Sequence, residues 1–139
     1  MPVKRVTPEQ ALELMRAEGY SYLDVRSVPE FDEGHPEGAY NVPLLHMGPG
    51  GGQPNREFLS VMERRFPKDA RLVVGCRSAG RSTQAIALLE QSGFTNLVLQ
   101  QSGFVGSSPL DQGWGPRGPP ASQRAEPGHS WEALKGDAE

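Results

Sequence analysis

One stretch near the middle of the chain most limits the folds that it can adopt, because a short apolar run there ends at the only cysteine. Residues 72–74 are Leu-Val-Val, and Cys76 follows after a single glycine. A short loop of small residues comes next, and apolar residues then recur at helical spacing, namely Ala85, Ile86 and Leu89. The pattern predicts a strand, a tight loop and a helix, with Cys76 at the first position of the loop.

Such a loop is suited to hold an anion. Backbone N–H groups that wrap over a helix N-terminus point inward, and the helix dipole adds positive partial charge. With Cys76 in this position, the favoured anion is its own thiolate, and Arg77 and Arg81 add positive charge nearby. A thiolate is a nucleophile, so the loop predicts covalent catalysis at Cys76. The alternative is a buried cysteine that packs as a small apolar side chain. Two nearby arginines and the helix start argue against this alternative.

Composition excludes several classes of function. The 139 residues carry a net charge of −3 with both signs scattered, so we expect no nucleic-acid or membrane partner. A single cysteine excludes an internal disulfide and any CxxC site for a metal or for redox chemistry. His35, His46 and His129 lack the spacing of metal ligands, so we expect no metal. No signal peptide or membrane-length apolar run is found, which favours a soluble, cytoplasmic protein.

Helix signals alternate with short apolar runs along most of the chain. Thr7 with Gln10, and Ser27 with Glu30, have the spacing of helix capping boxes. In order, we expect a helix from Pro8 to before Gly19, a strand at 22–25, a short helix from Ser27 to Gly34, a strand at 38–42, a flexible loop at 48–52, a helix between Asn55 and Pro67, a strand at 72–74, a helix at 82–92 and a strand at 97–99. This alternation predicts an α/β fold with a mainly parallel sheet.

The last part of the chain differs in composition. From Gly113 to Gly128, eight of sixteen residues are glycine or proline. We therefore expect a domain at 1–112 and an irregular tail at 113–139 that follows the surface or is mobile, with one helical turn at 130–135. Trp114 and Trp131 are unfavourable in water, so one or both are expected to dock the tail on the domain.

Two motifs in this order resemble those of a known family. The chain resembles rhodanese-like domains in two places: their N-terminal signature at residues 23–26, 30–31, 34–39 and 41–43, and their active-site loop at residues 76–82. The resemblance covers about residues 5–114. It implies a five-stranded parallel sheet with helices on both faces, and sulfur transfer through a cysteine persulfide without a cofactor. The implied donor is thiosulfate or a persulfide, and the implied acceptor is cyanide, a thiol or a protein.

The resemblance also assigns roles by position. Cys76 would take the sulfane sulfur, and the terminal sulfur of its persulfide would be held by the backbone N–H groups of the loop residues Arg77, Ser78, Ala79, Gly80 and Arg81. The arginine side chains would attract an anionic donor. Asp24 and Arg26 match a structural pair that braces the loop from behind, and His35 and Asn41 match structural positions.

The sequence departs from the family in one region. After the last expected strand it has serine within Gln101-Ser102-Gly103-Phe104, where two glycines are common. Residues 106–109 stand where a tryptophan is common, and Trp114 is the residue that could supply this aromatic side chain.

A cysteine in such a loop also occurs in proteins with three other functions. A cysteine-dependent phosphatase of related fold needs five residues between its cysteine and arginine, whereas four separate Cys76 from Arg81 and the next residue is Ser82. An arsenate reductase fails on the same spacing and lacks a second cysteine. A non-enzymatic persulfide carrier or regulatory binding module stays open, although inactive relatives typically lose the cysteine.

Overall fold

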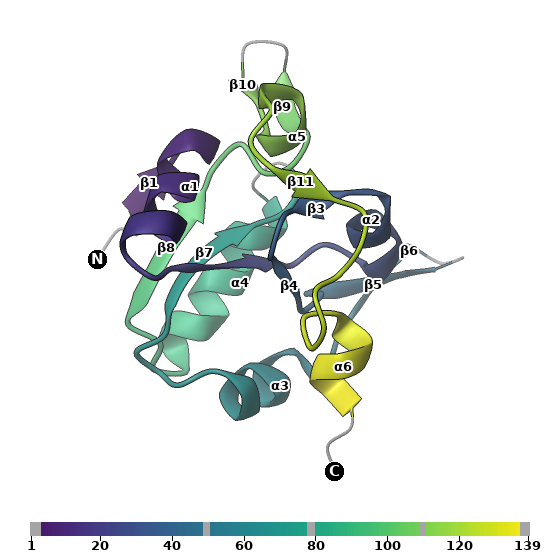
Figure 1. Cartoon of the computed structure of the whole chain (residues 1–139). Helices are drawn as coiled ribbons and strands as arrows, with labels where there is room; N and C mark the ends of the chain where they lie inside the picture. The colour runs from purple at the N-terminus through teal and green to yellow at the C-terminus, as the bar shows by residue number, and fades with distance from the viewer. Residues whose placement is uncertain (1–3, 49–50, 78–79, 109–110, 137–139) are drawn as a thin grey trace.

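The centre of the molecule is a five-stranded parallel sheet in the order β1-β8-β7-β2-β4 (Figure 1). The computed structural model describes residues 4–48, 51–77, 80–108 and 111–136. The strands are β1 (Lys4–Val6), β2 (Ser21–Asp24), β4 (Tyr40–Asn41), β7 (Arg71–Gly75) and β8 (Asn96–Gln100). The predicted α/β class and parallel sheet are confirmed. The apolar pattern missed β1, and only the family resemblance implied a fifth strand.

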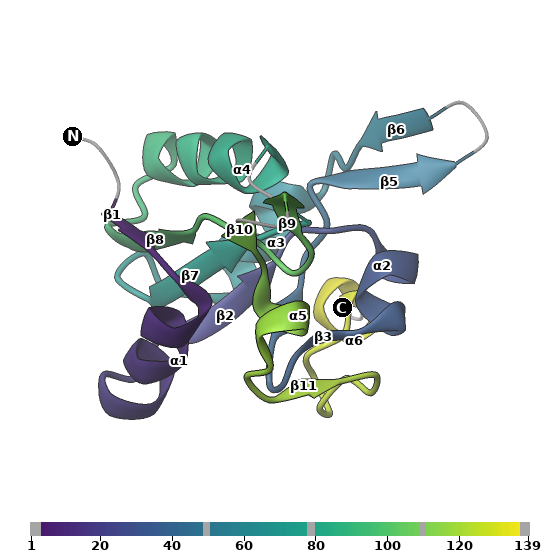
Figure 2. The same ribbon diagram turned by 90° about the horizontal axis from the view of Figure 1, so that it is seen from above.

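Helices cover both faces of the sheet, as expected. They are α1 (Pro8–Ala17), α2 (Val28–Glu33), α3 (Phe58–Arg65), α4 (Gly80–Gln91), α5 (Trp114–Arg117) and α6 (Trp131–Gly136). Figure 2 shows α1 and α4 on opposite sides of the strands. Successive residues of β7 point to opposite faces, so Leu72 and Val74 pack with α3 and α4 while Val73 packs with α1 and α5. Within the described ranges, no helix is long and apolar enough to span a membrane.

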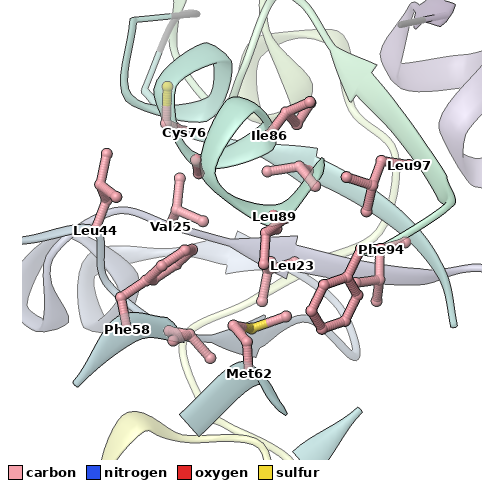
Figure 3. Packing of buried hydrophobic residues seen from close by; sticks show 14 of the residues in the cluster. Leu23, Val25, Leu44, Phe58, Met62, Cys76, Ile86, Leu89, Phe94 and Leu97 are labelled. Atoms are coloured by element: carbon pink, nitrogen blue, oxygen red, sulfur yellow. The ribbon is translucent and has the colours of Figure 1, made fainter. Parts of the chain in front are cut away.

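The larger of the two core clusters lies between the sheet and helices α3 and α4 (Figure 3). Leu23, Leu89 and Met62 are completely buried there. Burial of each such side chain contributes about 1.5–3 kcal/mol. Cys76 lies at the edge of this cluster, so the apolar core and the candidate site share a boundary.

Both predicted capping boxes are present. The Gln10 N–H donates to Thr7 Oγ1 at 3.1 Å and the Thr7 N–H donates to Gln10 Oε1 at 2.9 Å, which starts α1. The Ser27 N–H donates to Glu30 Oε1 at 3.1 Å at the start of α2. These contacts join residues three positions apart, which explains why a local pattern could predict them.

The prediction of a flexible loop at 48–52 is wrong at residues 48, 51 and 52, which lie in strands. A hairpin of β5 (Leu45–Gly48) and β6 (Gly51–Pro54) occupies this region and projects from the body of the molecule (Figure 2). Residues 49–50, between its strands, lie outside the described residues. Glycine and proline have poor strand propensity, so the composition concealed a pairing that depends on backbone hydrogen bonds.

The segment after residue 112 packs on the domain, and it contains more structure than expected. The strand β11 (Ala121–Ser122) pairs with β3 (His35–Pro36), and β9 (Gly106–Ser108) pairs with β10 (Asp111–Gln112) just before it. Trp114 is 0% exposed and Trp131 is 4% exposed, so both tryptophans dock the segment. The expected helical turn near 130–135 is present as α6.

Candidate active site

Cys76 lies where the sequence predicted it, at the carboxyl end of a central strand and before a helix. It follows β7 directly, and α4 begins four residues later. A Cβ atom on the preceding Gly75 would lie 1.9 Å from the hydroxyl of Tyr22, so only glycine fits there. The Gly75 carbonyl accepts a hydrogen bond from the Val25 N–H at 3.0 Å. The chain therefore enters the loop at a position fixed by β2.

The Cys76 sulfur contacts the first turn of α4. The backbone N–H of Ser82 donates to Sγ at 3.3 Å, and the Ser82 hydroxyl lies 3.3 Å from the same atom. Both groups can donate to a thiolate, and the N-terminus of α4 adds positive partial charge. Ser82 was not among the residues to which we assigned a role. The signal for it was its place at the start of the helix that follows the cysteine.

The loop backbone is held from outside by residues 104–106. The Phe104 N–H donates to the Cys76 carbonyl at 2.7 Å, and the Val105 and Gly106 N–H groups donate to the Arg77 carbonyl at 3.0 and 3.1 Å. Because a peptide unit is planar and trans, the Arg77 N–H points away from this segment. Ser78 and Ala79, which were expected to supply two further N–H groups, lie outside the described residues.

Gly103 explains how the departure from the family pattern is accommodated. It has φ +70°, and a Cβ atom on it would lie 2.5 Å from the Cys76 carbonyl oxygen. Ser102, one residue earlier, is buried, and no described residue other than glycine has positive φ. Of the two positions, only 103 therefore requires glycine.

We expect Gly103→Ala to lower the kcat/KM of any reaction at the Cys76 thiol about 100-fold, because the new methyl group must displace the cysteine loop. Gly19→Ala is a matched control, since Gly19 has φ +72° and open space around its Cβ position. Both substitutions place alanine at nearly the same positive φ, so the energetic cost of that backbone conformation is the same in the two variants. Only Gly103→Ala should also lose activity. Equal activity in the two variants would show that Gly103 does not shape the loop.

Asp24 and Arg26 form a buried ion pair with 2.7 Å between Arg26 Nη2 and Asp24 Oδ2. Burial disfavours the charged guanidinium, but the adjacent carboxylate outweighs it and raises the pKa of Arg26 above its ordinary value. Arg26 also donates to the Gly34 carbonyl at 2.6 Å and lies over the Phe104 ring, 4.6 Å from its centre. The Phe104 N–H donates to the Cys76 carbonyl, so Phe104 connects the Asp24–Arg26 ion pair to the cysteine loop.

His35 and Asn41 make the buried contacts expected of structural residues. The amide group of Asn41 donates to the carbonyls of Asp24 and Arg26, at 3.0 Å each. His35 stacks on Phe31, with 3.6 Å between ring centres, and its Nδ1 lies 2.7 Å from the Phe31 carbonyl. Neither side chain contacts the Cys76 sulfur in the described structure.

Arg81 does not extend into the pocket as an unpaired cation. Its guanidinium donates two hydrogen bonds to the Glu30 carboxylate, at 2.6 and 2.9 Å. Partial burial alone would raise the pKa of Glu30, but hydrogen bonds from Arg81 and Ser27 outweigh it and lower that pKa to about 2. We had assigned Glu30 only to a capping box. Sequence offers no sign of this second contact, because the two residues are 51 positions apart.

The Glu30 pair should make stability depend on pH. The pKa of Glu30 is about 2 in the folded protein, whereas its ordinary value is 4.5. The contribution of the ion pair to the free energy of unfolding is therefore complete above pH 4.5 and is lost as the pH falls toward 2. We expect Glu30→Gln to lower the free energy of unfolding by about 1 kcal/mol at pH 7. Urea denaturation of both proteins between pH 7 and pH 2 measures this difference. A difference that does not shrink in acid would contradict the assignment.

A pocket of about 360 Å³ opens beside the cysteine. Its lining residues are Leu45, Cys76, Arg77, Gly80, Arg81 and Gln84. Arg77 is exposed, and Leu45 comes from the hairpin that the sequence did not predict. Among residues 4–48, 51–77, 80–108 and 111–136, no group of three or more His, Cys, Asp or Glu side chains could hold a metal ion.

A cysteine at the carboxyl end of a parallel strand, in contact with a helix N-terminus and a pocket, defines a cysteine-centred α/β site. The sequence model of the rhodanese-like domain matches residues 7–107. The chain therefore belongs to the rhodanese-like domain family.

Known proteins support this placement. The chain is 42% identical over 79 residues to thiosulfate sulfurtransferase 16, chloroplastic, of Arabidopsis thaliana, which covers 57% of this chain and 66% of the relative. It is 39% identical over 95 residues to the senescence-associated protein DIN1 of Raphanus sativus, covering 68% of this chain and 51% of the relative. The chain thus spans about half to two thirds of these relatives. The crystal structure of Rv0390 from M. tuberculosis has a TM-score of 0.74 and 26% identity, covering 89% of this chain and all of that one.

Proposed function

We propose that this protein is a sulfurtransferase that moves a sulfane sulfur from thiosulfate or a persulfide to a thiophilic acceptor through a persulfide on Cys76. The observation that carries the proposal is the contact of Cys76 Sγ with the Ser82 N–H in the first turn of α4, beside an open pocket. Membership of the rhodanese-like family and a relative named thiosulfate sulfurtransferase support it.

In the first half-reaction, the Cys76 thiolate attacks the outer sulfur of thiosulfate. The sulfur–sulfur bond of thiosulfate breaks, and sulfite leaves with the bonding electron pair. The product is a Cys76 persulfide whose terminal sulfur carries the negative charge. Backbone N–H groups of the loop and the N-terminus of α4 stabilise that charge, and such preorganised donors commonly supply the largest catalytic contribution.

In the second half-reaction, a nucleophilic acceptor such as cyanide or a thiolate attacks the terminal sulfur. The persulfide bond breaks, and the electron pair returns to Cys76 as its thiolate. The protein undergoes no net oxidation, so neither half-reaction needs a redox cofactor. The scheme predicts ping-pong kinetics, because the first product leaves before the acceptor reacts.

Intact-mass spectrometry tests the proposal directly. The purified protein is measured before thiosulfate, after thiosulfate and then after cyanide, with an alkylated sample as control. We expect a gain of one sulfur atom on Cys76, no gain in the alkylated sample, and removal of that sulfur by cyanide as thiocyanate. A free thiol that gains no sulfur from thiosulfate or from a persulfide donor would overturn the proposal.

A separate rate measurement distinguishes an enzyme from a sulfur carrier. An enzyme should complete many turnovers with thiosulfate and cyanide under steady-state conditions. A carrier should gain and lose one sulfur in the mass experiment but show negligible turnover with small acceptors.

A further inference from the structure

The charge of the Cys76 pocket is lower than its two arginines suggest. Glu30 pairs with Arg81 in a bidentate geometry, with one oxygen on each terminal nitrogen, so the cation nearest the helix N-terminus is neutralised. Their side chains are 26% and 18% exposed, so water screens the pair only partly. Arg77 then remains as an exposed positive charge on the pocket lining.

Glu30 is held in place independently of Arg81. The backbone N–H and the hydroxyl of Ser27 both donate to Glu30 Oε1, at 3.1 and 2.8 Å. These contacts belong to the start of α2, so the carboxylate cannot turn away without loss of the capping box. Because the pKa of Glu30 is lowered to about 2, the carboxylate is charged at any physiological pH. The neutralisation of Arg81 is therefore a constant feature of the pocket.

Leu45 supplies a hydrocarbon side chain to the pocket lining, next to Cys76 and the two arginines. Leu45 on β5 packs against the main core cluster and also lines the pocket. On the facing strand β6, a Cβ atom at Gly52 would lie 3.1 Å from Leu45 Cδ1, so the backbone of this glycine packs close to the leucine side chain. The pocket volume of about 360 Å³ lies within the usual range for sites that hold small organic molecules.

We propose that this pocket is built for an organic sulfane donor with a single negative charge, whose hydrocarbon group packs against Leu45, and that Glu30 sets this preference by neutralising Arg81. The inference rests on the proposed sulfurtransferase function. Glu30 is a positioning residue in this scheme because it acts through Arg81. A small dianion such as thiosulfate would gain less from the pocket, since it has no apolar group and meets less positive charge.

The chemistry is the same for such a donor. The Cys76 thiolate attacks the outer sulfur of a thiosulfonate, R–SO2–S⁻. The sulfur–sulfur bond breaks, a sulfinate R–SO2⁻ leaves with the electron pair, and the Cys76 persulfide forms. Charge and atoms balance without a further reactant.

Three donors separate the effects of charge and of apolar contact. Thiosulfate is a small dianion, methanethiosulfonate is a small monoanion, and benzenethiosulfonate is a monoanion with a large apolar group. For each, the KM and kcat of persulfide transfer are measured in the wild type and in variants. Intrinsic differences in donor reactivity cancel when each kinetic constant of a variant is divided by that of the wild type.

Glu30→Gln should lower the KM for thiosulfate about fivefold relative to the KM for methanethiosulfonate, because Arg81 regains its full charge. Asp32→Asn is the matched control, since it removes one negative charge from an exposed position of the same helix. Leu45→Ala should lower kcat/KM for benzenethiosulfonate about tenfold relative to methanethiosulfonate. Met47→Ala, an exposed residue of the same strand, should leave that ratio unchanged.

Several results would overturn the inference. If Glu30→Gln changed the KM for all three donors by the same factor, Glu30 would have only a structural role. If Leu45→Ala left the ratio of the two thiosulfonates unchanged, no hydrocarbon group would contact Leu45. Both results leave the proposed function intact, because persulfide still forms. Absence of a Cys76 persulfide with every donor would instead refute the proposed function, and the inference with it.

Discussion

Replacement of Cys76 by serine is expected to abolish sulfur transfer and to leave the fold intact. A serine hydroxyl stays protonated near neutral pH and cannot form a persulfide, so the covalent route is lost. Removal of the nucleophile from a covalent enzyme commonly lowers kcat by several orders of magnitude, and we expect a loss on the order of 10⁴-fold or more. Steady-state assays with thiosulfate and cyanide measure kcat/KM for both proteins.

The Cys76→Ser protein should keep its stability because the new side chain is nearly isosteric. Cys76 is buried, and its polar contacts go to Ser82, which a serine hydroxyl can also bond. Thermal unfolding should therefore give a similar midpoint for the two proteins. Retained turnover in a well-folded Cys76→Ser protein would exclude the persulfide mechanism.

The features that the sequence predicted are local ones. Cys76 directly follows β7 and lies four residues before α4, and the capping residues are three apart, so neighbouring positions in the sequence determine these features. The apolar runs at β7 and β8 are buried on both faces, which makes their strand character visible as continuous hydrophobic residues. This local information was enough to place Cys76 between a strand and a helix.

Long-range contacts were missed because no local pattern encodes them. Glu30 and Arg81 each have a local role, and only the folded chain brings them together. Leu45 reaches the pocket through a hairpin whose glycines suggested an unstructured loop. The strand β1 lacks an apolar run because, among its residues, only Val6 is buried. The charge and shape of the pocket could therefore be read only from the structure, whereas the position of Cys76 after a strand and before a helix could be predicted from the sequence.

The segment after residue 112 illustrates how composition can mislead. Its glycines and prolines predicted irregular structure, and much of it does lack long elements. Backbone groups nevertheless hold it in place, since the Glu37 N–H donates to the Pro120 carbonyl and the Asn41 N–H donates to the His129 carbonyl, at 3.0 and 2.9 Å. Trp131 and Leu134 also complete the larger core cluster. The two tryptophans were the sequence signal that this segment docks.

Trp114→Ala should be the most destabilising of the substitutions considered. Trp114 is 0% exposed and packs edge-on against Tyr22, with 5.4 Å between ring centres. Its indole N–H also donates to the Pro120 carbonyl at 2.8 Å. Truncation of a buried tryptophan to alanine typically costs about 3–5 kcal/mol, because both contact area and cavity energy are lost. We expect a loss of that size in the free energy of unfolding from urea denaturation.

The effect should extend to the active site, because Tyr22 links the two regions. The Tyr22 hydroxyl lies directly under Gly75 and accepts a hydrogen bond from Gln100 at 3.1 Å, so a shift of its ring would move the start of the cysteine loop. Trp114→Phe keeps an aromatic contact with Tyr22 and should recover most of the stability and activity. Leu88→Ala, at a position 36% exposed, serves as a surface control and should cost less than about 1 kcal/mol. If Trp114→Ala cost no more than this control, the segment would not be docked through Trp114, and the support of Gly75 by Tyr22 would not depend on it.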